Sequence, residues 1–178
     1  KKVVLATNAY TGPEFSWFRR RIIPVGSHMM ATETLDRELI DTLLPSEALV
    51  NDTRSLAYAI RKSPDGTRIL VGGRALSRNR ADAPSVAVRL MKILGQILPD
   101  LPPVRASHAW EGNVGFTLDR IPHIGVRHGV HYVTGCNGSG IVMSSYLGMR
   151  AAQLACGVGQ PSAFSDNAFK ALPFYSGN

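Results

Sequence analysis

The segment that most constrains this chain is TGCNGSG, residues 134–140, which places three glycines within six residues. The residues before it, 129–134 (GVHYVT), alternate as a strand does, and residues 141–156 after it have the character of a helix that stops at Gly157. Glycine lets a ligand approach the backbone without interference from a Cβ atom. Free amides at a helix start attract negative charge, by roughly 0.3–1 kcal/mol and up to about 2 kcal/mol in a partly buried site. Taken alone, the segment is equally compatible with a ligand site and with a tight turn that binds nothing.

The other regular elements are predicted from apolar periodicity and from Pro and Gly positions. A buried strand covered on both faces is expected at residues 3–6, because VVLA is apolar throughout. A type I turn with a bulge at residues 63–66 (SPDG) predicts a hairpin. Further strands are expected at residues 21–32, 56–60, 68–71 and 104–117. A short helix is expected at residues 39–44 and is ended by Pro45. A longer helix is expected to begin at Ser85 or Asp82, to run to Leu98 and to be closed by Pro99. Strands and helices in this order, without regular βαβ alternation, predict an α+β fold with a mostly antiparallel sheet flanked by helices.

Composition excludes several classes of protein. A chain of 178 residues with 44% hydrophobic and 19% charged residues is typical of an ordinary globular domain. No apolar run approaches the roughly 18 residues of a membrane span, and no signal peptide is recognised at the start, so no membrane partner is expected. The net charge of +7 raises the possibility of nucleic-acid binding, but the arginines are dispersed apart from residues 19–21, and no reading motif accompanies them. We therefore expect no nucleic-acid partner.

The cysteines and histidines indicate neither a disulfide scaffold nor a metal site. Two cysteines, Cys136 and Cys156, are too few for a disulfide framework and favour a reducing, cytoplasmic setting. The five histidines lack the spacing of metal ligands, so no metal is expected.

A succession of short motifs connects the chain to a known family. In order they are VVLATNAYTG, the PDG hairpin ending in GGR, WEG, TLDRIPHIG and TGCNGSG with its helix. Together, from Val3 to Gly157, they resemble the D-amino acid oxidase-like family of FAD-dependent oxidoreductases, and within it the glycine/D-amino acid and γ-glutamylputrescine oxidase branch. The resemblance implies oxidation of the C–N bond of an amine or amino acid by hydride transfer to flavin. The alternative is a non-catalytic binding domain that retains the same fold.

The resemblance also implies a domain organisation. Residues 1–20 would end an FAD-binding domain, residues 21–103 would form the substrate domain, and residues 104–178 would return to the FAD-binding domain. The G-x-G-x-x-G turn that holds the ADP part of FAD does not occur in the chain. We therefore expect a C-terminal fragment that lacks its N-terminal FAD-binding half, is inactive alone and does not retain FAD.

Cofactor contacts are implied at two places. The amides of Gly138, Ser139 and Gly140 would face the N1–C2=O region of the flavin, where negative charge develops when hydride arrives at N5. No cysteine lies near Gly112, so the flavin is expected to be non-covalent. The full set of expected FAD-binding residues is Thr7, Asn8, Gly135, Asn137, Gly138, Ser139, Gly140, Ile141 and Val142.

No catalytic residue is assigned from the sequence. Candidates for the substrate pocket are Tyr58, Arg61, Arg74 and Trp110, with arginine as a carboxylate fork and the aromatic residues as walls. Each is at least as compatible with sheet packing or with a solvated strand edge. Two further residues are given structural roles: His123 is interpreted as structural, and Asp119 as an acceptor that fixes a loop rather than as a base.

Overall fold

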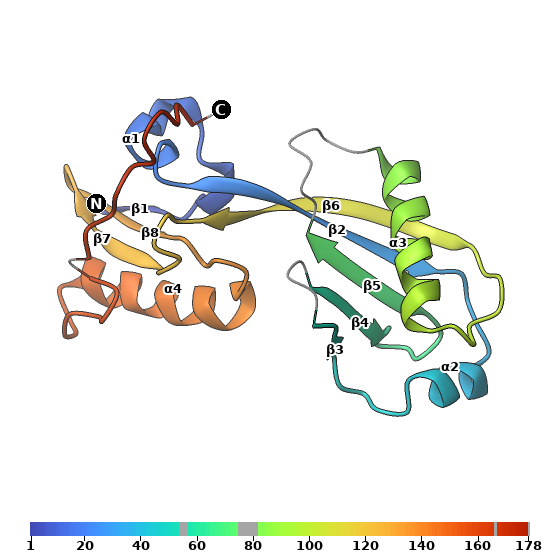
Figure 1. Cartoon of the computed structure of the whole chain (residues 1–178). Coiled ribbons are helices and arrows are strands. Elements are labelled where there is room, and N and C mark those ends of the chain that lie inside the picture. The colour runs from blue at the N-terminus through green and yellow to red at the C-terminus, as the bar shows by residue number, and fades with distance from the viewer. Residues whose placement is uncertain (54–56, 75–81, 166, 178) are drawn as a thin grey trace. The chain divides into compact units, whose positions relative to one another are not determined.

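The computed structural model describes residues 1–53, 57–74, 82–165 and 167–177, with the side chain of Arg74 left out of the description. The chain divides into two compact units, one formed by Lys1–Val25 with Asn113–Asn178 and the other by Gly26–Gly112 (Figure 1). The fold is α+β with mostly antiparallel strand pairing, as the sequence predicts. In the described ranges, no helix is both long and apolar enough to cross a membrane.

The second unit is built on a five-stranded sheet with the order β3-β4-β5-β2-β6. Its strands are β2 (Ile23–Thr32), β3 (Val50–Asn51), β4 (Tyr58–Lys62), β5 (Ile69–Arg74) and β6 (Ala106–Phe116). Met30, Val71 and Ile60 lie directly opposite one another across β2, β5 and β4, so their side chains share one face of the sheet.

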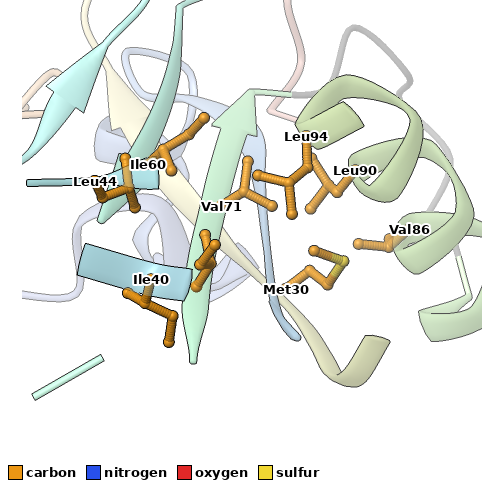
Figure 2. Close-up of a cluster of buried hydrophobic side chains, with 9 residues drawn as sticks. Met30, Ile40, Leu44, Ile60, Val71, Val86, Leu90 and Leu94 are labelled. Carbon is orange, nitrogen blue, oxygen red and sulfur yellow. The ribbon is translucent and has the colours of Figure 1, made fainter. Parts of the chain in front are cut away.

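Helices α2 (Arg37–Leu43) and α3 (Ala83–Ile97) pack into a core on that face (Figures 1 and 2). From α3 the core receives Val86, Leu90 and Leu94, which follow the i, i+4, i+8 spacing of one helical stripe. From α2 and the residue after it, Ile40 and Leu44 complete the cluster. The periodicity of α3 in the sequence therefore identifies the side that covers the sheet.

Local chemistry sets the helix ends. Of the two residues proposed to open α3, Asp82 is the N-cap, because its carboxylate accepts a hydrogen bond from the Ser85 amide at 2.9 Å. Asp36 caps α2 in the same way by accepting from the Glu38 amide at 2.8 Å. The predicted stops before Pro45 and Pro99 are confirmed, since the helices end at Leu43 and Ile97.

The predicted hairpin joins β4 and β5. The Gly66 amide donates to the Ser63 carbonyl at 2.9 Å, and Gly66 has a φ of 69°, a conformation that glycine adopts without strain. This is the expected turn with a left-handed glycine at its end. Leu56, the first residue of the predicted hairpin, lies outside the described residues.

The first unit contains a three-stranded sheet with the order β1-β8-β7. Strand β1 (Val3–Leu5) runs parallel to β8 (Val130–Thr134), and β7 (His123–Arg127) is antiparallel to β8. Helix α4 (Gly140–Cys156) packs on one face through Leu147 and Ala151 and ends at Gly157, whose φ of 71° makes it the predicted glycine stop. Leu5, Phe18 and Ile22 form a separate cluster. Three short helical turns, η1 (Asn8–Tyr10), η2 (Pro13–Phe15) and α1 (Ser16–Arg19), connect β1 to β2.

Two expectations about strands are corrected. The strand at residues 3–6 was expected to be covered on both faces, but Val3 is 58% and Val4 is 46% exposed, so no described element covers either face of β1 at these two positions. Strand β7 was not foreseen, because HIGVR is short and follows Pro122 without a clear alternation. Its pairing with β8 supplies the backbone partners that the local sequence does not signal.

Candidate functional site

The glycine-rich turn lies where two parallel strands end together. The register aligns Leu5 of β1 with Tyr132 of β8, so the residues that follow, Thr7–Asn8 and Thr134–Gly135, leave the sheet at the same edge. The carboxyl ends of parallel strands are the usual location of ligand sites in open α/β sheets. Residues separated by more than 120 positions in sequence thus meet at one place.

Asn8 fastens this turn to the end of β1. Its side-chain oxygen accepts from the Gly135 amide at 3.0 Å and from the Thr134 hydroxyl at 3.3 Å, while its Nδ2 donates to the Cys136 sulfur at 3.2 Å. The backbone of Asn8 has a φ of 46°, in the left-handed region that asparagine tolerates better than most residues. Asn8, one of the expected FAD-binding residues, therefore uses its carboxamide to hold the turn.

Asn137 performs a similar task on the other side. Its side-chain oxygen accepts from the Thr117 amide at 3.0 Å, its Nδ2 donates to the Gly135 carbonyl, and its own amide donates to the Gly115 carbonyl at 3.2 Å. Asn137 also has a positive φ, 52°. The turn is thereby connected to the end of β6, and both asparagine side chains are engaged within the protein.

Gly115 and Thr117 are parts of this site that sequence reasoning did not identify. A Cβ atom at Gly115 would lie 2.2 Å from the Asn8 side-chain oxygen and 3.1 Å from the Ala9 amide, so the close approach of β6 to Asn8 requires glycine. Thr117, which was grouped with the motif TLDRIPHIG, donates its hydroxyl proton to the Ile121 carbonyl at 2.9 Å. The signal in the sequence was Gly115 within an otherwise regular strand, which indicates a close backbone approach.

The first turn of α4 presents hydrogen-bond donors beside an apolar surface. The first hydrogen bond of the helix runs from the Met143 amide to the Ser139 carbonyl at 2.9 Å, so the amides of Gly140, Ile141 and Val142 have no partner within the helix. The side chains of Ile141 and Val142 are 89% and 77% exposed. A Cβ atom at Gly140 would meet nothing within 4 Å.

One of the expected amide donors is not free. The Ser139 amide, predicted to face the flavin, donates instead to the Cys136 carbonyl at 2.9 Å, which closes the turn. The donors that remain at the helix start, together with two exposed apolar side chains and open space at Gly140, suit a flat ring system with carbonyl groups at its edge. The residues present therefore fit the pyrimidine end of a flavin.

The candidate substrate residues lie on two faces of the five-stranded sheet. Tyr58 is half-buried, packs against the α3-side core and leans over Gly73, where an added Cβ atom would come within 2.3 Å of the ring. Arg61 is exposed and alternates with the buried Ile60 and Lys62, which puts it on the opposite face. The structure thus separates Tyr58 from Arg61.

Trp110 shares the face of Arg61. Ala109 packs against the α3-side core and Glu111 reaches His28 Nε2 at 3.3 Å, so Trp110 between them points to the other side and is 45% exposed. β4 and β6 are three strand spacings apart, so the strands that carry Arg61 and Trp110 are separated by about 14 Å across the sheet. Arg74 belongs to β5 and pairs with Ser27, but its side chain lies outside the described residues.

The exposed Asp119 and the buried His123 form a pair that fixes a loop. His123 is 1% exposed, its Nε2 lies 3.1 and 3.2 Å from the two carboxylate oxygens of Asp119, and its ring stacks on Phe169 at 4.1 Å. Burial alone would raise the pKa of Asp119, but hydrogen bonds from the Ile121 amide, His123 and Thr117 together hold it below its usual value. Asp119 is therefore the loop-fixing acceptor expected from the sequence. Among the residues that the structure describes, no group of three potential metal ligands is found.

Comparisons with known proteins agree with this geometry. The chain is 34% identical over 158 residues to the probable oxidoreductase OrdL of Rhizobium meliloti (strain 1021), covering 88% of this chain and 36% of that protein. It is 31% identical to the gamma-glutamylputrescine oxidoreductase of Escherichia coli (strain K12), covering 98% of this chain and 40% of that protein. The chain thus spans about two fifths of the length of these relatives.

A solved structure shares the fold, and a family model matches the chain. The glycine oxidase of Bacillus cereus ATCC 14579 superposes with a TM-score of 0.69 at 20% identity, over 92% of this chain and 44% of that enzyme. The family model described as DAO, FAD dependent oxidoreductase, matches residues 1–154. Because that match takes in the larger part of the chain, both ends of the glycine-rich turn included, the protein belongs to the DAO family of FAD-dependent oxidoreductases.

Proposed function

We propose that this chain is the C-terminal part of an enzyme that oxidises the C–N bond of an amine or amino acid with FAD as the hydride acceptor. The observation that carries the proposal is the start of α4, where the amides of Gly140, Ile141 and Val142 are free of intrahelical partners at the edge where β1 and β8 end. Membership of the DAO family supplies the cofactor class. A gamma-glutamylputrescine oxidoreductase and a glycine oxidase among the similar proteins support the substrate class by their names.

The two compact units correspond in this proposal to two domains. Lys1–Val25 with Asn113–Asn178 would belong to the FAD-binding domain, and Gly26–Gly112 would form the substrate domain. The FAD itself would be non-covalent, and the remaining part of that domain would come from sequence outside this chain. The cytoplasmic location expected from the two cysteines stays a prediction; Cys136 and Cys156 are free thiols.

In this proposal, the residues at the turn act on the flavin through hydrogen-bond donors at its edge and apolar side chains over its ring. When bound, FAD supplies the hydride acceptor, and the substrate imine that results reacts with water. The amides of Gly138 and Gly140 would donate to the carbonyl edge of the ring, where preorganised donors stabilise developing negative charge. Ile141 and Val142 would cover the ring and exclude water from it. Asn8 and Asn137 would hold these donors in place without contacting the ring.

The face of the five-stranded sheet that carries Arg61 and Trp110 is the proposed substrate side. A guanidinium can bind a carboxylate through two parallel hydrogen bonds, which suits Arg61 to the acid group of an amino acid or of a γ-glutamyl amine. Trp110 would form an apolar wall at the other end of this face. Because their strands are separated by about 14 Å across the sheet, an extended substrate can contact both, whereas a single small group cannot.

The test replaces Gly140 by alanine in the intact protein. The added Cβ meets no protein atom within 4 Å, and alanine favours helix over glycine, so the fold should be unharmed. The methyl group would nevertheless occupy the space proposed for the ring, so flavin binding should weaken at least tenfold, measured by flavin fluorescence titration of the apoprotein. The control is Gly95→Ala in α3, an exposed helical glycine that also has open space around it.

Two results would contradict the proposal. Flavin affinity in Gly140→Ala equal to that of the Gly95→Ala control would remove the turn from the cofactor site. Stoichiometric flavin without oxidation of any amine or amino acid, scored by anaerobic bleaching of the flavin absorbance, would favour the alternative of a non-catalytic domain with the same fold.

A further inference from the structure

The three consecutive arginines at residues 19–21 have different environments. Arg21 lies over the Trp17 ring at 3.8 Å, and it donates to the carbonyl oxygens of Phe169 and Trp17, each at 2.8 Å. Arg20 is exposed. Arg19 is half-buried and lines a cavity of about 220 Å³ within the first unit. The basic cluster seen in the sequence is therefore not one continuous charged surface.

The stem of Arg19 is held by the C-terminal segment. A Cβ atom at Gly177, whose φ is 94°, would lie 2.6 Å from Cγ and 3.1 Å from Cδ of Arg19, so the backbone of the segment packs directly on the aliphatic part of the side chain. Tyr175 and Gly177 both line the cavity and lie beyond the part of the chain that the family model matches. The packing restrains Arg19 before any ligand arrives, which lowers the entropic cost of binding.

The charge of Arg19 is not neutralised within the described ranges. No carboxylate lines the cavity, and no ion pair or hydrogen bond of the Arg19 guanidinium occurs among the described residues. A guanidinium carries five N–H donors and no acceptor, so an anion is the ligand that it can satisfy. A restrained guanidinium without an acidic partner among the described residues leaves its donors available to an anion from solution.

Tyr10 and Asn113 are among the other polar residues that line the same cavity. The Tyr10 hydroxyl accepts from the Asn113 amide at 2.8 Å and keeps its own proton available to donate. Asn113 is exposed and contributes a carboxamide. A guanidinium, a phenol and a carboxamide around one space can donate together to the oxygens of a single small anion.

We propose that this cavity is a binding site for a small oxyanion, carried by a carboxylate or a phosphate, with Arg19 as its cation. The site is formed within the first unit, and its proposed donors lie outside residues 134–140, although Asn8, which holds the glycine-rich turn, also lines the cavity. It does not depend on the proposed function, because none of its donors belongs to the start of α4. Tyr175 and Gly177 of its lining lie beyond the residues that the family model matches, whereas Arg19, Tyr10 and Asn113 lie within them.

The experiment measures thermal unfolding of the intact protein in sodium acetate, sodium succinate and inorganic phosphate, each against sodium chloride of equal ionic strength. A ligand that binds the folded state raises Tm with a saturating dependence on its concentration. We expect such a rise with at least one of the three oxyanions. The salt that produces it distinguishes a monocarboxylate, a dicarboxylate and a phosphate.

The decisive variant is Arg19→Met, which keeps an unbranched apolar stem beneath Gly177 but removes the charge. It should weaken the apparent affinity for the oxyanion at least tenfold, whereas Arg20→Met, the exposed neighbour, should leave it unchanged. If Arg19→Met does not fold, Tyr10→Phe takes its place and should weaken binding severalfold. A rise in Tm that is the same in Arg19→Met, or in its replacement Tyr10→Phe, as in the wild type would overturn the site, and so would no rise above chloride with any oxyanion. Flavin content, measured on the same samples, reports separately on the proposed function.

Discussion

Replacement of Asn8 by alanine should loosen the glycine-rich turn, and the size of the effect follows from the contacts that are lost. The Gly135 amide loses its acceptor at 3.0 Å, and a donor left without a partner costs about 1–3 kcal/mol. Alanine at a φ of 46° adds about 1 kcal/mol of backbone strain. The free energy of unfolding should therefore fall by about 2–4 kcal/mol.

Two further substitutions separate the effect of the lost hydrogen bond from the effect of backbone strain. Asn8→Gly loses the same side chain but adopts the positive φ without strain, so it should be about 1 kcal/mol less damaging than Asn8→Ala. Asn8→Asp keeps an acceptor for the Gly135 amide and loses the donor to the Cys136 sulfur, so it should be the mildest of the three.

The assay combines chemical denaturation with flavin titration of the intact protein. Asn51→Ala, an exposed position on β3 in the other unit, is the control and should change stability by no more than about 0.5 kcal/mol. If Asn8 acts as a positioning residue, flavin affinity should fall in the order of the stability losses. Equal stability of Asn8→Ala and the wild type, or equal values for Asn8→Ala and Asn8→Gly, would refute the reasoning.

Three further predictions concern the substrate side, the hairpin and the isolated chain. Arg61→Ala should raise KM ten- to a hundredfold for substrates with a carboxylate, about 1.5–3 kcal/mol, but not for analogues without one, and Arg61→Lys should recover little of this. The Ser63 hydroxyl and the Thr67 amide lower the pKa of Asp65 from 3.8 to about 2, so the stability that Asp65 adds is complete above about pH 4 and is lost as the pH falls to about 2. The difference in Tm between wild type and Asp65→Asn should therefore vanish over that range, and a difference independent of pH would contradict the assignment. The 178-residue chain alone should purify without stoichiometric FAD, because it contains no G-x-G-x-x-G turn for the pyrophosphate; a full complement of flavin would contradict this.

Much of the local structure was determined by the sequence itself. The cap at Asp82, the stop at Gly157 and the hairpin turn at residues 63–66 all depend on side chains and dihedral preferences within a few residues. Such determinants act over one turn of chain, so they can be identified without knowledge of the rest of the molecule. The family is likewise indicated by the order of the motifs along the chain, which does not depend on how they meet in space.

The candidate sites depended on tertiary structure. The sequence marked Asn8 and Asn137 as cofactor residues, but the fold brings Asn8 against Gly135, 127 positions away, and uses both side chains to shape the turn. Alternation placed Arg61 and Trp110 on strands without revealing which face each strand would bury. That choice was made by α2 and α3, which cover one face of the sheet and leave Arg61 on the other. A strand pattern repeats every two residues whichever side is buried, so only the packing of distant elements decides which side chains remain available for chemistry.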